Sequence, residues 1–172
     1  MWQPQIIKAF GLTNLQTGFV NSIPYGIATV LMILWGRHSD RTAERRWHTA
    51  IPLLLAAFGL ASLTAASSIT LTVFAVSCAL VGAYSFKGPF WALSAGWLSA
   101  STLAAGLAGI NAIANLIGGG LMVNIVGLVK EWTGSYALGM LPVAALDAAA
   151  ALSVLIISRS HARETATATA TA

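Results

Sequence analysis

Residues 88–129 read GPFWALSAGWLSASTLAAGLAGINAIANLIGGGLMVNIVGLV and contain no Asp, Glu, Lys or Arg. One helical crossing of a bilayer needs about 20 apolar residues. Two more uncharged stretches, 9–36 and 49–86, precede this one, and 132–158 carries only Asp147. A soluble core helix has no use for uncharged runs of this length, so the sequence predicts a multi-spanning membrane protein.

The overall composition supports this prediction. Only 8% of the 172 residues are charged and 57% are hydrophobic, whereas a soluble domain carries about a quarter charged residues. Soluble enzymes, nucleic-acid binders and disulfide-rich secreted domains are therefore excluded. Cys78 is the single cysteine, and the three histidines lack metal-ligand spacing. We therefore predict no metal, no cofactor and no catalytic residue.

Polar and turn-forming residues divide the sequence into five predicted transmembrane helices, which makes the fold class all-α integral membrane. The predicted spans are 17–35, 49–67, 70–98, 103–129 and 136–157. The third span is too long for one straight crossing, so we expect a kink or break at its Lys87-Gly88-Pro89 sequence. Residues 1–16 are expected to be the outer end of a truncated helix followed by an extracellular or periplasmic turn. The Thr-Ala repeats of 159–172 predict a disordered cytoplasmic tail.

The distribution of positive charge predicts the orientation in the membrane. With five spans, the 36–48 loop and the C-terminal tail lie on one side, and the turns with Lys8 and Lys130 lie on the other. The first side carries Arg37, Arg41, Arg45, Arg46, Arg159 and Arg163. The positive-inside rule then places this side in the cytoplasm and the N-terminus outside, in a cell (inner or plasma) membrane.

The block 36–46, GRHSDRTAERR, interleaves acidic and basic residues after a glycine. Such a block can form a latch of ion pairs across the cytoplasmic ends of neighbouring helices, made in one conformer and broken in another. The alternative is a basic loop that only fixes topology. The candidate latch residues are Gly36, Arg37, Asp40, Arg41, Glu44, Arg45 and Arg46.

This block resembles the G-x-x-x-D-R-x-G-R-R loop between the second and third helices of each half in the major facilitator superfamily. It has one extra residue before Arg45-Arg46, and Ala43 stands where glycine is common. The stretches 87–93 and 109–119 resemble the anion:cation symporter branch, which includes permeases for phthalate, tartrate and glucarate. The resemblance covers about residues 3–160.

The resemblance implies that the five spans are helices eight to twelve of a twelve-helix transporter, most of its C-terminal six-helix bundle, with the substrate site between the halves. The implied function is proton-coupled symport of a small organic anion, such as a sugar acid or an aromatic or dicarboxylic acid. Its partners would be that anion, protons, the bilayer and a missing N-terminal half, without which the chain is expected not to transport. The alternatives are an inert or associating membrane fragment and a half-size carrier that homodimerises. No nucleophile–base pair suggests an enzyme.

An ionisable residue inside a span is by default a candidate for function. Tyr84, Lys87 and Trp91 share one helix face, and a cation beside aromatic rings suits a carboxylate substrate. The alternative is that Lys87 snorkels to the headgroups. Asn111 and Asn115 also share a face, where they can donate to a substrate or join two helices; the resemblance favours substrate contact for Asn111.

Asp147 lies in the middle of the last span and matches no motif of the family. It is a proton-coupling carboxylate, a residue tolerated beside a small-residue interface, or the result of drift in a non-functional fragment.

Overall fold

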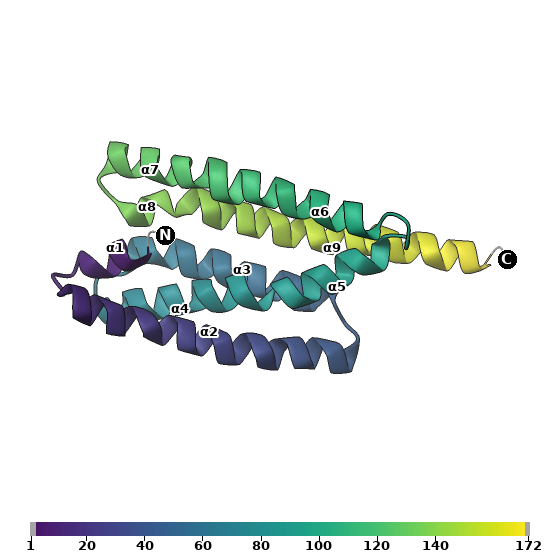
Figure 1. The fold of residues 1–172 in the computed structure, drawn as a ribbon, viewed down its shortest axis with the longest axis horizontal. Coiled ribbons are helices and arrows are strands. Elements are labelled where there is room, and N and C mark those ends of the chain that lie inside the picture. Colours follow the sequence, from purple (N-terminus) through teal and green to yellow (C-terminus); the bar gives the residue numbers. More distant parts are fainter. Residues whose placement is uncertain (1–2, 171–172) are drawn as a thin grey trace.

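The computed structural model describes residues 3–170, and within this range the chain forms a bundle of helices (Figure 1). The α-helices are α1 Gln3–Lys8, α2 Asn14–Thr42, α3 Arg46–Ser62, α4 Ile69–Ser85, α5 Lys87–Trp97, α6 Leu103–Ala114, α7 Met122–Thr133, α8 Tyr136–Gly139 and α9 Leu141–Ala170. A 3₁₀ turn, η1 Leu63–Ala65, extends α3, and a π-helical segment, η2 Asn115–Leu121, joins α6 to α7.

Five helical segments in the described range are long and apolar enough to cross a membrane. They are Asn14–Thr42, Arg46–Ala65, Ile69–Trp97, Leu103–Thr133 and Tyr136–Ser160. The prediction of an all-α membrane protein with five transmembrane helices is therefore confirmed.

Local hydrogen bonds explain where several of these helices begin and end. Thr13 and Gln16 form a reciprocal capping box at the start of α2, and the Ser68 hydroxyl accepts from the Leu71 amide at the start of α4. Gly134 ends α7 in the left-handed region, with φ +73°, a conformation that glycine adopts without steric cost. These signals are visible in the sequence and give the short connections between spans.

The 36–48 segment departs from the predicted loop, because α2 continues as a helix through Thr42. Only 43–45 separates α2 from α3, and Ala43 supplies the turn with a left-handed φ of 52°. The sequence marks where the apolar stretch ends at Gly36. A helix need not end there, since charged residues are good helix formers once they reach water. Gly36, Arg37, Asp40 and Arg41 thus lie on the last turns of α2.

The predicted break in the third span is present at Phe86, between α4 and α5. Pro89 has no N–H, so it cannot donate to the carbonyl of Ser85 one turn earlier. The Phe86 backbone keeps helical angles, φ −71° and ψ −25°, so the two helices remain close to continuous.

The π-helical segment η2 interrupts the fourth span in the sequence NLIGGGL, and the sequence analysis did not foresee it. Three consecutive glycines give this turn little side-chain packing to hold α-helical geometry. Such π segments occur often at functional sites in membrane and soluble helices.

Helix α3 lies at the centre of the fold, packed against α4 and α9, while α2 packs on the far side of α4. Two glycines permit the α3–α4 contact: a Cβ on Gly59 would meet the Ala79 backbone, and one on Gly82 would meet the backbone of Pro52 and Ala56. Small residues allow this close approach, which is the usual way membrane helices associate.

Much of the large apolar surface faces outward. Leu15, Phe19 and Leu116 are 72%, 69% and 73% exposed, respectively. Large apolar side chains are stable in such outward-facing positions only when lipid or another protein surface surrounds them. This exposure fits the membrane assignment.

The two ends of the bundle differ in charge. The α2–α3 link and the C-terminal part of α9 lie at one end of the molecule, and α1 and the α7–α8 turn lie at the other (Figure 1). The arginine-rich segments therefore gather at one end, as predicted. The structure also differs from the predicted disordered tail, since α9 continues to Ala170. Alanine-rich sequence readily extends a helix that has already formed; residues 171–172 lie outside the described range.

Candidate functional site

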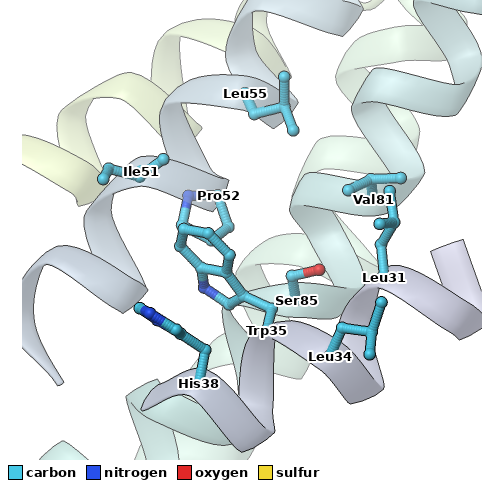
Figure 2. Close-up of a pocket in the computed structure, with 9 residues that line it drawn as sticks. All are labelled: Leu31, Leu34, Trp35, His38, Ile51, Pro52, Leu55, Val81 and Ser85. Atoms are coloured by element: carbon cyan, nitrogen blue, oxygen red, sulfur yellow. The ribbon is translucent and has the colours of Figure 1, made fainter. Parts of the chain in front are cut away.

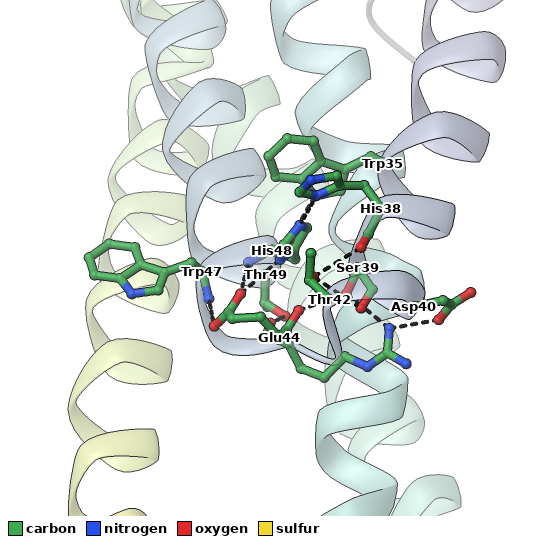
Figure 3. Close-up of polar contacts among 10 residues, drawn as sticks. Trp35, His38, Ser39, Asp40, Thr42, Glu44, Trp47, His48 and Thr49 are labelled. Atoms are coloured by element: carbon green, nitrogen blue, oxygen red, sulfur yellow. Dashed lines mark hydrogen bonds and ion pairs between the residues drawn. The ribbon is translucent and has the colours of Figure 1, made fainter.

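The link between α2 and α3 carries a network of polar contacts (Figure 3). Arg45 Nη1 donates to Asp40 Oδ1 at 2.7 Å and to Ser39 Oγ at 2.9 Å. The buried Ser39 hydroxyl in turn donates to the carbonyl of Glu44 at 2.9 Å. These bonds tie the last turn of α2 to the residues that lead into α3.

Glu44 lies at the start of α3 and holds it by three contacts. Its carboxylate accepts from the backbone N–H groups of Trp47 and His48 at 2.8 and 3.1 Å, and lies 2.7 Å from His48 Nδ1. Burial alone would raise the Glu44 pKa, but the amides and His48 outweigh it, and the pKa is lower than usual. Glu44 is therefore an ionised cap for the α3 N-terminus.

Two histidines, His48 on α3 and His38 on α2, extend this network from Glu44 to α2. His48 Nε2 lies 2.7 Å from His38 Nδ1, and the Trp35 indole N–H donates to the His48 carbonyl at 2.8 Å. The rings of Trp35 and His48 lie 4.9 Å apart. Because the Glu44 carboxylate can only accept, His48 Nδ1 carries the proton of that contact, and the tautomers of the two rings set the direction of the contact between His48 and His38.

The structure thus brings part of the predicted latch together and leaves part of it apart. Asp40, Glu44 and Arg45 make contacts, and within the described residues both ion pairs lie inside this α2–α3 hairpin. Arg37 and Arg41 are exposed. Arg46 stacks its guanidinium 5.4 Å from the Trp47 ring, and its Nε and Nη2 atoms are buried without a hydrogen-bond partner. The sequence did not single out His38 and His48, whose spacing of ten residues gives no helical pattern.

A cavity of about 530 Å³ opens beside this network, between α2, α3 and α4 (Figure 2). Its walls are almost entirely apolar. The residues that line it are Leu31, Leu34, Trp35, His38, Ile51, Pro52, Leu55, Val81 and Ser85. The Ser85 hydroxyl, labelled in Figure 2, is buried without a partner. The cavity carries no charge that could select an anion.

A second cavity, of about 600 Å³, collects most of the predicted substrate-lining residues. Lys87 and Trp91 reach it from α5, Asn111 from α6 and Asn115 from the start of η2. These residues are separated by up to 28 positions in the sequence and come from two different spans. The cavity therefore offers one cation, two carboxamides and aromatic walls to a bound molecule.

Tyr84 lies outside this cavity but touches its cation. The Lys87 Nζ atom lies 4.6 Å from the centroid of the Tyr84 ring, a cation–π contact. Tyr84 lines a neighbouring cavity of about 720 Å³, which Lys87 also borders. Tyr84 precedes Lys87 by three residues, so the two side chains meet on one helix face.

The two asparagines differ in whether their side-chain N–H groups are already hydrogen-bonded. Asn115 Nδ2 donates to the Asn111 backbone carbonyl at 2.8 Å and to Asn111 Oδ1 at 3.2 Å. The Asn115 amide nitrogen is therefore engaged within its own helix. Both residues are exposed, and the Asn111 nitrogen keeps its two N–H groups for another acceptor.

Asp147 also lines this cavity, from α9. The sequence showed it as a lone carboxylate in an apolar span, without any hint of which side chains would face it. Only the packing of α9 against the other helices places it with Lys87.

Comparison with known proteins identifies the class of molecule. The chain is 44% identical to a protein of Agrobacterium vitis that carries the name tartrate transporter, over 92% of this chain and 36% of that protein. A second Agrobacterium vitis protein of the same name is 43% identical over 99% of this chain and 38% of its own length. A quinolone resistance transporter of Acinetobacter baumannii is 33% identical over 81% of this chain and 32% of its own. The helices and these relatives define a multi-pass membrane protein related to transporters.

These relatives support the predicted resemblance to the major facilitator superfamily, and proteins named tartrate transporters are among them. The chain spans about a third of the length of the curated relatives it matches. No family model matches the sequence, and no solved structure matches it. The relatives carry the names of transporters and not of enzymes, which supports the prediction that this chain is not an enzyme.

Proposed function

We propose that this chain forms the C-terminal bundle of a secondary active transporter that carries a small organic anion together with protons. A sugar acid such as tartrate is the substrate class that its relatives' names favour. The observation that carries the proposal is the cavity shared by Lys87, Trp91 and Asn111. In a membrane span such a cation is expensive unless it serves a purpose.

The chemistry of the cavity suits a hydroxylated carboxylate. Lys87 would supply charge, and the free N–H groups of Asn111 would donate to a carboxylate or hydroxyl oxygen. Trp91 would cover the carbon skeleton with an apolar face. The Tyr84 ring contacts the ammonium, so the anion would meet a cation whose position is partly set.

The α2–α3 network would act as the latch that is formed in one conformer and released in another. Its Asp40–Arg45 ion pair is surface-exposed, with side-chain exposures of 71% and 27%. A surface pair is worth only about 0–1 kcal/mol, so it can break during each cycle. In the proposed orientation this network and the C-terminus face the cytoplasm and the N-terminus lies outside.

The chain alone is proposed not to transport, because one wall of the site is absent from it. Only 6% of the most apolar window in Leu103–Thr133 is buried inside the fold. This segment carries Asn111 and Asn115, so its exposed faces are available to the rest of a transporter.

The test is uptake of labelled tartrate and related sugar acids into vesicles under an imposed proton gradient. One set of vesicles would contain this chain alone, and another would contain it co-expressed with the part of an Agrobacterium vitis relative outside the matched region. Uptake in the second set alone supports the proposal. Uptake by the chain alone favours the homodimerising carrier, and no uptake in either set favours an inert fragment.

The role of Lys87 has its own control in this assay. Lys87→Ala should raise the half-saturation concentration at least tenfold, and Lys87→Arg should raise it less because the charge is kept. Equal half-saturation concentrations in the Ala variant and the unaltered protein would rule out anion binding by Lys87.

A further inference from the structure

Asp147 is the charged side chain of the cavity that the proposed binding site does not use. It lies on α9 with its side chain half-buried, and it lines the same 600 Å³ space as Lys87. The two ion pairs in the described part of the chain join other residues, so Asp147 takes part in neither. A half-buried carboxylate in an apolar span is stable only when a cation lies near it or a proton neutralises it.

Lys87 is the only cation among the residues that line this cavity with Asp147, and in the described chain the two form no ion pair within 4.0 Å. Helix α3 contributes Leu53, and α5 contributes Lys87 among aromatic residues. Helix α6 and η2 contribute two carboxamides with apolar and glycine neighbours, and α9 itself adds only aliphatic residues. The remaining lining residues are Phe86, Phe90, Trp91, Ile110, Asn111, Ala114, Asn115, Ile117, Gly118, Leu146, Ala150 and Val154.

We propose that Asp147 is the counter-charge of Lys87, and that a substrate carboxylate displaces it by competing for the same ammonium while Asp147 takes up a proton. The inference rests on the proposed function for the identity of the ligand. It assigns to Asp147 the role that the sequence left open.

The charge of the cavity explains why binding and protonation would be linked. In the empty cavity one ammonium faces one carboxylate, and the net charge is zero. A substrate carboxylate brings a second negative charge beside that of Asp147 into a space of low dielectric, where two like charges repel strongly. One proton, delivered by hydronium from the aqueous phase, forms an O–H bond on a carboxylate oxygen of Asp147 and leaves water behind, which offsets the charge of that substrate carboxylate. By linkage, the proton also strengthens anion binding.

The structure provides a direct way to observe this carboxylate. Asp40 and Asp147 are the aspartates of the sequence, so a chain labelled with ¹³C at the Asp carboxyl carbon gives two resolvable signals. Asp40, in the α2–α3 network, serves as the internal reference. The labelled 172-residue chain would be titrated in lipid nanodiscs.

The first measurement needs no ligand. Lys87→Met keeps the length of the side chain but removes its charge, and it should raise the Asp147 titration midpoint by at least about one pH unit, a tenfold change in proton affinity. Lys130→Met should leave the Asp147 midpoint unchanged, because Lys130 lies in the last turn of α7 and does not line the cavity. An Asp147 midpoint unchanged by Lys87→Met would overturn the proposal.

The second measurement adds tartrate to the labelled chain reconstituted with the unlabelled part of an Agrobacterium vitis relative outside the matched region, since the chain alone is proposed to lack one wall of the site. Saturating tartrate should raise the Asp147 midpoint in the unaltered chain, leave Asp40 in place, and have no effect on Asp147 in Lys87→Met. Tartrate that binds by calorimetry without moving Asp147 would overturn the competition between the two carboxylates. Absence of tartrate binding would instead count against the proposed function, while the first measurement still decides the pairing of Lys87 with Asp147.

Discussion

Replacing Gly82 by alanine should destabilise the fold, although alanine is the better helix former. A Cβ at this position would lie 2.5 Å from the Ala56 amide nitrogen and 2.8 Å from the Ala56 Cβ, and it would also meet the Pro52 carbonyl oxygen. Ordinary contact begins at 3.4 Å, and the Pro52 carbonyl oxygen is the nearest atom, so α3 and α4 must separate by about 1 Å. A gap of this size forfeits a quarter to a half of the dispersion energy of each contact that it opens.

The magnitude follows from two opposing terms. Overpacking of this kind costs about 1–3 kcal/mol, and the gain in helix propensity returns about 0.5–1 kcal/mol. The difference between these terms is about 0–2.5 kcal/mol, and the free energy of unfolding should fall by an amount in the upper part of this range because the Cβ meets backbone atoms that cannot move aside. Gly26→Ala in α2 is the matched control, since a Cβ at Gly26 has no atom within 4 Å. The control should be neutral or more stable by up to about 1 kcal/mol.

The assay is reversible unfolding of the purified chain by SDS in mixed micelles, followed by helical circular dichroism. The two substitutions are chemically identical and differ only in what surrounds them, so opposite signs would isolate the α3–α4 contact. A Gly82→Ala chain as stable as the unaltered protein would refute the close packing of these helices.

Three further predictions concern the α2–α3 link and the break in the third span. In the folded chain the pKa of Glu44 lies below its usual 4.5. Ionised Glu44 therefore stabilises the fold at pH values above 4.5, and this stabilisation is lost as the pH falls through the lowered pKa. SDS unfolding at pH 7 and pH 3 should show a smaller acid loss for Glu44→Gln, and equal losses would contradict the capping role. Asp40→Asn should slow turnover in the co-expression assay more than it weakens binding, and unchanged turnover would reduce the link to a topology signal. Pro89→Ala should restore a hydrogen bond to the Ser85 carbonyl and bring α4 and α5 into line. The distance between spin labels at positions 72 and 96 should then lengthen. An unchanged distance would show that Pro89 does not cause the break.

How much of the site could be predicted depended on the kind of evidence that each residue left in the sequence. Lys87 could be found because a charge inside an apolar run violates the composition around it. Asn111 and Asn115 could be found from their four-residue spacing. His38 and His48 could not, because their contact depends on the turn at Ala43 that brings α2 back against α3.

The sequence by itself determined the class of the protein and its five crossings. Hydrocarbon accepts only long apolar segments whose backbone groups are satisfied internally, so the uncharged runs leave a single solution, the transmembrane helix. Capping residues and Pro89 then placed most helix ends within a few positions. These are local effects, carried by residues near one another along the chain.

Only the tertiary structure decided which faces of these helices meet. The close approach at Gly59 and Gly82 sets α3 against α4, and the packing of α9 on α3 carries Asp147 to the cavity that Lys87 lines. In lipid every face of an apolar helix is equally soluble, so hydropathy gives no direction to the packing. The partners are chosen instead by shape and by the few polar groups, and these are brought together only when the whole chain has folded.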